Sequence, residues 1–139
     1  MMDLKEALEE SVIEEVEIDE ELVEKEAREA ENDLRKTKEN YERDDYKWSI
    51  ISAYYSMFHR VKALMFSKVY REKGHLATLV FLDYLIKQGE LERKYKDYFM
   101  SAKEAREDAD YRYRYSEERA EEVLDYCIKF NERIKEIIS

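Results

Sequence analysis

Hydrophobic positions recur at helical spacing along most of the chain, and they are densest in residues 48–70. Apolar side chains fall at 48, 51, 55 and 58 and again at 50, 54, 57, 61, 64 and 65. About three quarters of this helix circumference therefore needs cover, whereas an ordinary surface helix shows one apolar stripe. The stretch contains no Gly or Pro. We expect one long central helix that other helices enclose on several sides.

The remaining stripe of the central helix advances by three or four residues and is mostly small. It consists of Ser49, Ser52, Ser56, Arg60, Ala63 and Ser67. Small side chains let a neighbouring helix approach closely, so the stripe predicts a groove for a second helix. We expect that helix to come from a second copy of the chain in a two-fold dimer. The alternative is a helix of the same chain.

The other helical segments have recognisable ends. Asp19 is the expected N-cap of a helix that runs to about residue 43, and Asp44 or Asp45 caps the central helix. A third helix, from 76 to about 87, stops at Gly89, and a fourth keeps heptad-like spacing from 91 to 109. Residues 108–116 lack a helical pattern, and Ser116 caps the last helix.

These segments predict an all-α fold, an antiparallel bundle of four to five helices joined by short loops. The bundle is expected over residues 19–139, after an acidic arm or short helix at residues 1–18. The length of 139 residues fits one domain, and two Gly and no Pro leave few helix breakers. A charged fraction of 43% with four Asn and Gln residues resembles the composition of hyperthermophile proteins and suggests a thermophile source.

Charge and apolar content also bear on location and partners. Residues 1–33 carry 15 acidic and 3 basic groups, a net charge of −12, and the rest carries 20 acidic and 22 basic groups, a net charge of +2. This acidity argues against general nucleic-acid binding but leaves room for a local basic site. No apolar run approaches the ~18 residues of a membrane span, and no signal-peptide pattern is present, so we expect a cytoplasmic protein. The single Cys127 predicts a small buried side chain.

Two groups of polar residues are candidates for chemistry, and they could converge at one end of the bundle. The first is His59, Arg60, Tyr70, Arg71, Lys73 and His75; the second is Arg106, Asp110, Tyr111, Arg112, Tyr113 and Arg114. The second group offers guanidinium groups for phosphate and aromatic faces for base stacking. Composition alone favours the other interpretation, a solvated and ion-paired loop. His59 is interpreted as a core histidine bonded to a neighbouring helix, and Tyr54 and Tyr55 as core residues with satisfied hydroxyls.

Metal and thiol chemistry have little support. Glu72 and His75 have the spacing of a di-iron ligand pair, but such sites need a second pair and further glutamates, which the sequence lacks. We therefore expect no metal and no cofactor. Cys127 on an apolar helix seam is not expected to act as a nucleophile.

Three separate motifs together resemble the HEPN family (higher-eukaryote and prokaryote nucleotide-binding domain), over about residues 20–138. They are Tyr54-Tyr55-x-x-Phe58-His59, Lys73-Gly-His75 and Arg106-x-x-x-Asp110-Tyr111. The chain looks most like small stand-alone prokaryotic members encoded beside minimal nucleotidyltransferases. The resemblance implies a helical homodimer in which the arginine motifs of both subunits face a shared cleft. In active members that cleft cuts RNA without a metal.

The active family pattern is an Arg, four to six residues, a His, and often a Tyr two residues later that a partner nucleotidyltransferase modifies. By this resemblance Arg106 is the motif arginine, Tyr111 stands where the His is expected, and Tyr113 is the modifiable Tyr. A phenol with a pKa of about 10 is a poor base at neutral pH. The resemblance therefore implies weak or absent RNase activity.

Three hypotheses remain from the sequence. The first is a homodimeric, nucleotide- or RNA-binding partner of a minimal nucleotidyltransferase in a toxin–antitoxin-like pair. The second is an active metal-independent ribonuclease in which a Tyr or His75 assists Arg106. The third is a non-catalytic helical adaptor that binds its partner through the acidic N-terminal segment. The expected site comprises Arg106 and Tyr111 as catalytic residues and Arg106, Asp110, Tyr111, Arg112, Tyr113 and His75 as binding residues.

Overall fold

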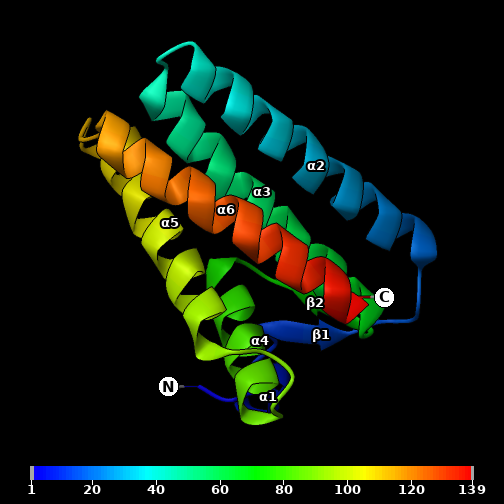
Figure 1. The fold of residues 1–139 in the computed structure, drawn as a ribbon. Coiled ribbons are helices and arrows are strands. Elements are labelled where there is room, and N and C mark those ends of the chain that lie inside the picture. Colours follow the sequence, from blue (N-terminus) through cyan, green and yellow to red (C-terminus); the bar gives the residue numbers. More distant parts are fainter. Residues whose placement is uncertain (1, 139) are drawn as a thin grey trace.

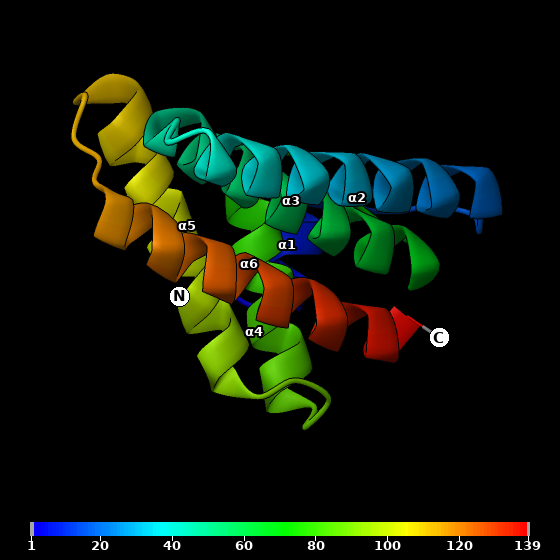
Figure 2. The same cartoon turned by 45° about the horizontal axis from the view of Figure 1, so that its top comes forward.

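The computed structural model describes residues 2–138 and confirms the all-α bundle (Figure 1). The helices are α1 (Leu4–Glu9), α2 (Glu20–Glu42), α3 (Tyr46–Ser67), α4 (His75–Lys87), α5 (Arg93–Tyr111) and α6 (Glu117–Ile138). The strands β1 (Ile13–Glu15) and β2 (Tyr70–Glu72) form an antiparallel pair in which Ile13 lies opposite Glu72. The turned view shows α2 and α6 as long rods on either side of α3 (Figure 2).

The central helix α3 is enclosed as its apolar pattern predicts. It packs against α2, α5 and α6 and also contacts α4 and β2. Tyr54, Met57, Val61, Leu64 and Met65 have no exposed surface. Burial of side chains of this size contributes roughly 1.5–3 kcal/mol each, so α3 is the main source of core stability.

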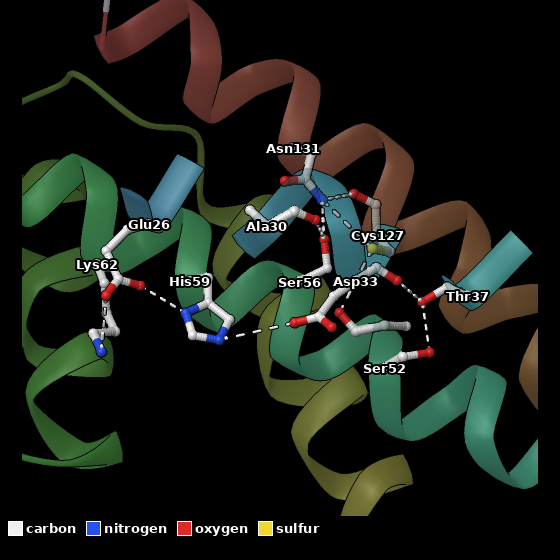
Figure 3. Close-up of polar contacts among 11 residues, drawn as sticks. Glu26, Ala30, Asp33, Thr37, Ser52, Ser56, His59, Lys62, Cys127 and Asn131 are labelled. Atoms are coloured by element: carbon white, nitrogen blue, oxygen red, sulfur yellow. Dashed lines mark hydrogen bonds and ion pairs between the residues drawn. The ribbon is translucent and has the colours of Figure 1, made fainter. Parts of the chain in front are cut away.

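The stripe of small residues on α3 is also buried, but against helices of the same chain. Ser56 Oγ donates a hydrogen bond to the backbone oxygen of Ala30 on α2 at 2.7 Å. On the other side, Asn131 Nδ2 on α6 donates to Ser56 Oγ at 3.1 Å, and Arg60 Nε donates to Asn131 Oδ1 at 2.8 Å. Figure 3 shows Ser56 between Ala30 and Asn131. The prediction that a second copy fills this groove is therefore wrong, because α2 and α6 already occupy it.

Most helix ends follow the predicted caps. The Asp19 carboxylate accepts hydrogen bonds from the backbone N–H groups of Glu21 and Leu22, and Asp45 accepts one from Trp48. Gly89 adopts φ 75°, the left-handed conformation that favours glycine after a helix. The Ser116 hydroxyl accepts a hydrogen bond from the Arg119 backbone.

Two boundaries differ from the predicted ones. The central helix ends at Ser67 instead of continuing to 70, because Tyr70–Glu72 pairs with β1. Helix α5 continues to Tyr111, two residues beyond the end of the predicted heptad-like spacing at 109. Ala109 is fully buried in the core, which anchors this last turn. Arg106, Asp110 and Tyr111 therefore lie on a helix and not in a loop.

Residues 2–18 form the short helix α1 and the strand β1. Ala7 and Ile13 from this segment belong to the same apolar core as α3. The short helix is one of the two alternatives expected here, whereas the strand was not expected. The division of the chain after residue 18 stays a prediction.

Candidate functional site

Arg106, on the last turns of α5, lies against two consecutive tyrosines of α3. Its Nη2 donates a hydrogen bond to the Tyr55 hydroxyl at 2.8 Å. The guanidinium carbon is 5.3 Å from the ring centre of Tyr55 and 5.9 Å from that of Tyr54. Aromatic faces attract such a cation, more strongly where water is excluded. The Arg106 side chain is 13% exposed, so its charge is held in a nearly fixed position.

Two further groups complete the surroundings of Arg106. The Tyr111 ring centre is 5.0 Å from the guanidinium carbon, and Asp110 Oδ2 is 3.4 Å from Nη2. Arg106 Nε is buried and makes no hydrogen bond within the described part of the chain. Arg106 therefore combines one satisfied nitrogen, one carboxylate neighbour and one unsatisfied N–H group.

His75, at the start of α4, joins this site through Tyr54. The fully buried Tyr54 hydroxyl and His75 Nδ1 form a short hydrogen bond. Burial raises the pKa of Tyr54, so the phenol stays protonated and its O–H is available to donate to Nδ1 when the imidazole proton is on Nε2. Burial, and then the positive charges of Arg106 and Lys103, lower the pKa of His75. His75 therefore lies near Arg106, one pair out of the two groups that could converge, and its lowered pKa favours the neutral imidazole at pH 7.

The other polar residues of the first predicted group lie elsewhere. Tyr70 and Arg71 belong to β2, and Arg60 faces α6 and α2, where it bonds Asn131 and Glu31. His59 Nδ1 forms a 2.6 Å hydrogen bond with Glu26 on α2, as predicted for a histidine bonded to a neighbouring helix (Figure 3). Burial alone would raise the pKa of Glu26, but its bonds to His59 and Lys62 outweigh this and lower it. This cluster stabilises the α2–α3 contact.

The residues after Arg106 form an exposed aromatic surface. Tyr111 is 64% exposed and Tyr113 is 74% exposed. Lys47 Nζ lies 5.2 Å from the Tyr113 ring centre and 5.5 Å from that of Trp48, which is 51% exposed. The start of α3 therefore meets the α5–α6 connection. We call Trp48, Tyr111 and Tyr113 the aromatic rim.

Sequence reasoning missed the part that Lys47 and Trp48 play in this surface. Trp48 was counted among the apolar positions of the central helix, and nothing in its spacing indicates that the first turn projects beyond the core. The proximity of Asp44 and Asp45, two cap candidates, was the available signal that Trp48 lies at a helix end. Arg112 Nη1 forms an ion pair with Asp108 Oδ1, one helical turn earlier, at 3.0 Å. Its charge is therefore engaged on its own helix and not beside Arg106.

Neither metal nor thiol chemistry finds a site in the described residues. No group of three or more His, Cys, Asp or Glu side chains within residues 2–138 is placed to hold a metal ion. Burial raises the pKa of Cys127 to about 12, as expected for a buried thiol. No helix in this part of the chain is long and apolar enough to cross a membrane.

The His75 environment predicts a measurable titration. Its pKa should lie below the ordinary 6.5 and should rise in Arg106→Ala, because one of the repelling charges is removed. In the wild type, the lowered pKa means that the unfolded state binds the His75 proton more readily than the folded state does. The contribution of His75 to the free energy of unfolding should therefore fall as pH drops below 6.5. Imidazole C–H resonances measured against pH test this, and His75→Gln assigns the signal between the two histidines. A His75 pKa that is not lowered and does not change in Arg106→Ala would contradict the arrangement.

Comparison with known proteins identifies the family of the chain. A model of the HEPN domain matches residues 23–138. "Putative toxin MJ0142" of Methanocaldococcus jannaschii is 36% identical over 93 residues, which cover 66% of this chain and 60% of the relative. "Putative toxin MJ0605" of the same organism is 31% identical over 111 residues, 78% of this chain and 83% of the relative. The match to the HEPN model covers most of the chain, and the chain belongs to the HEPN domain family.

Proposed function

We propose that this chain is a toxin-like HEPN protein that binds a nucleotide or RNA around Arg106. It acts as a homodimer beside a minimal nucleotidyltransferase in a toxin–antitoxin pair, and its RNase motif is too degenerate for efficient cleavage. The observation that carries the proposal is the guanidinium of Arg106, held among three tyrosine rings with an unsatisfied N–H group. The names of the two relatives support the toxin-like role.

Phosphate recognition is the chemistry that Arg106 suits best. A guanidinium is always charged and offers several N–H donors in a fixed plane, which matches phosphate oxygens. The aromatic rim supplies exposed ring faces beside it, and base stacking on such faces contributes roughly 1–3 kcal/mol per base. The proposed homodimer would bring two such sites to one cleft. Light scattering that finds a monomer at tens of micromolar protein would remove the dimer from the proposal.

Binding of single-stranded RNA should depend on Arg106. Arg106→Ala should weaken binding by roughly tenfold, because a charge-assisted contact to phosphate is lost, and binding should fall as salt rises. Fluorescence anisotropy with a labelled oligoribonucleotide measures both effects. Arg35→Ala is the control, since Arg35 is an exposed arginine on α2 that pairs with Glu39. Equal affinities of wild type and Arg106→Ala across the salt series would favour the helical adaptor instead.

Cleavage of RNA should be at most a trace in the wild-type protein. Tyr111 stands where the family has its histidine, and a phenol rarely ionises at pH 7. Tyr111→His should raise cleavage, Tyr111→Phe should not, and adding Arg106→Ala to Tyr111→His should abolish the gain. Gel analysis of a labelled RNA in the presence of a chelator measures this.

The ribonuclease hypothesis keeps one specific support, the link from Arg106 through Tyr54 to His75. A neutral imidazole could assist proton transfer at a phosphate held by Arg106. Robust metal-independent cleavage by the wild type, lost in both Arg106→Ala and His75→Gln, would replace the first proposal with this one.

Tyr113 is the proposed acceptor of a nucleotidyl group from the partner transferase. Its phenol oxygen would form a bond to the α-phosphorus of a nucleoside triphosphate, the bond to pyrophosphate would break, and the phenol proton would pass to solvent. An exposure of 74% leaves the ring open to a second protein. Incubation with the transferase and ATP should add the mass of one AMP group to the wild type and to Tyr115→Phe, but not to Tyr113→Phe. Addition to Tyr113→Phe would remove Tyr113 from the proposal.

A further inference from the structure

A recess lies between α2 and α3, beside the Arg106 site. Its volume is about 310 Å³, and its lining includes Asp33 and Lys36 from α2 and Trp48, Ile51 and Tyr55 from α3. Tyr55 belongs to both places, because it lines the recess and its hydroxyl accepts a hydrogen bond from Arg106. Small-molecule sites begin at about 300 Å³, so the recess suits one small ligand and not a polymer chain. We call it the α2–α3 recess.

The walls of the α2–α3 recess favour a flat ring. Trp48 is 51% exposed, while Ile51 beside it is 6% exposed and provides an apolar surface. Tyr55 adds a second aromatic side chain. An indole that lies open at the edge of an apolar surface can stack on a planar aromatic ligand, and the tyrosine ring adds further contact area.

Asp33 gives the α2–α3 recess a partly exposed carboxylate that accepts no side-chain hydrogen bond from residues 2–138. Its side chain is only 16% exposed, and its Oδ2 lies 3.8 Å from His59 Nε2. That distance is too long for a hydrogen bond. Figure 3 shows this contact between Asp33 and His59. His59 is engaged through Nδ1 with Glu26, and burial raises the pKa of Asp33. A partly exposed carboxylate without a protein donor can exchange its water hydrogen bonds for one from a ligand N–H group.

We propose that the α2–α3 recess binds the base of a nucleotide that carries an exocyclic amino group. The base stacks on Trp48, its amino group donates a hydrogen bond to Asp33, and its phosphate pairs with Lys36. The ligand is therefore an adenine, cytosine or guanine nucleotide. The inference takes only the class of ligand from the proposed function, because the contacts that hold the base are separate from Arg106.

Trp48 makes the experiment direct, since it is the only tryptophan of the chain. Titration with AMP, CMP or GMP should quench its fluorescence saturably, and UMP, which lacks the amino group, should bind several-fold more weakly. Ribose 5-phosphate should produce no saturable change. Asp33→Ala should weaken AMP binding about tenfold, as expected for a lost hydrogen bond to a charged group. Glu21→Ala removes the same charge from an exposed position of α2 outside the recess lining and away from Asp33, so it should leave AMP binding unchanged.

Circular dichroism shows whether Asp33→Ala still folds. If it does not, calorimetry with Trp48→Leu replaces it, because Trp48 is half-exposed, and AMP binding should again fall about tenfold. Equal affinities for AMP and UMP would overturn the inference, and so would an AMP affinity that neither Asp33→Ala nor Trp48→Leu changes. So would Trp48 emission that changes with protein concentration but not with nucleotide, which would indicate that a second copy covers the recess.

The two proposals fail separately. RNA binding that is lost in Arg106→Ala, without any AMP-dependent quenching of Trp48, would leave the proposed function standing and overturn the recess. AMP binding that requires Asp33, together with RNA binding that ignores Arg106, would support the recess and overturn the proposed role of Arg106.

Discussion

The structure depends on a phenol that has no access to water. Tyr54 sits in the middle of α3, stacks on Phe99 of α5 at 5.4 Å, and bonds His75 at the start of α4. Leaving such a hydroxyl unsatisfied would cost roughly 1–3 kcal/mol, so this bond adds to the apolar contacts of Phe81, Leu82 and Leu85 in placing α4. The same ring lies 5.9 Å from Arg106. Tyr54 therefore links α3, α4 and α5 and packs beside Arg106.

The opposite side of α3 is held by a polar seam. The Ser56 hydroxyl bridges α2 and α6 through the Ala30 carbonyl and the Asn131 amide, and Arg60 continues the seam to Glu31. Every hydrogen bond in it joins elements of one chain, so it specifies which faces of α2 and α6 meet α3. It also limits the proposed homodimer, whose interface has to use surfaces other than the small-residue stripe. The aromatic rim and the exposed face around Arg106 are surfaces that remain open for it.

The sequence allowed the fold class and most helix ends to be predicted because these depend on local signals, namely apolar spacing and caps such as Asp19 and Gly89. It did not reveal the pairing of Ile13–Glu15 with Tyr70–Glu72, since strands of three residues leave almost no periodic pattern and pair over a long distance in the chain. Nor could spacing tell whether Ser56 faces its own chain or another one. For the site, the resemblance pointed to Arg106, Tyr111 and Tyr113, and the polar pattern made His75 a candidate. The link through Tyr54 and the place of Trp48 depend on how three helices meet.

The geometry of His75 bears directly on what the site can do. If Tyr54 donates to Nδ1, the imidazole proton lies on Nε2, and the neutral ring can donate a hydrogen bond but has no free nitrogen to accept a proton. Acting as a base would require His75 to give up the bond that satisfies a fully buried phenol. Tyr111 is no substitute for an imidazole, because phenols as a class are poor bases near neutral pH. A site built from a fixed guanidinium, a donor imidazole and phenols is suited to hold a phosphate, and proton removal is the step for which it has no ready group.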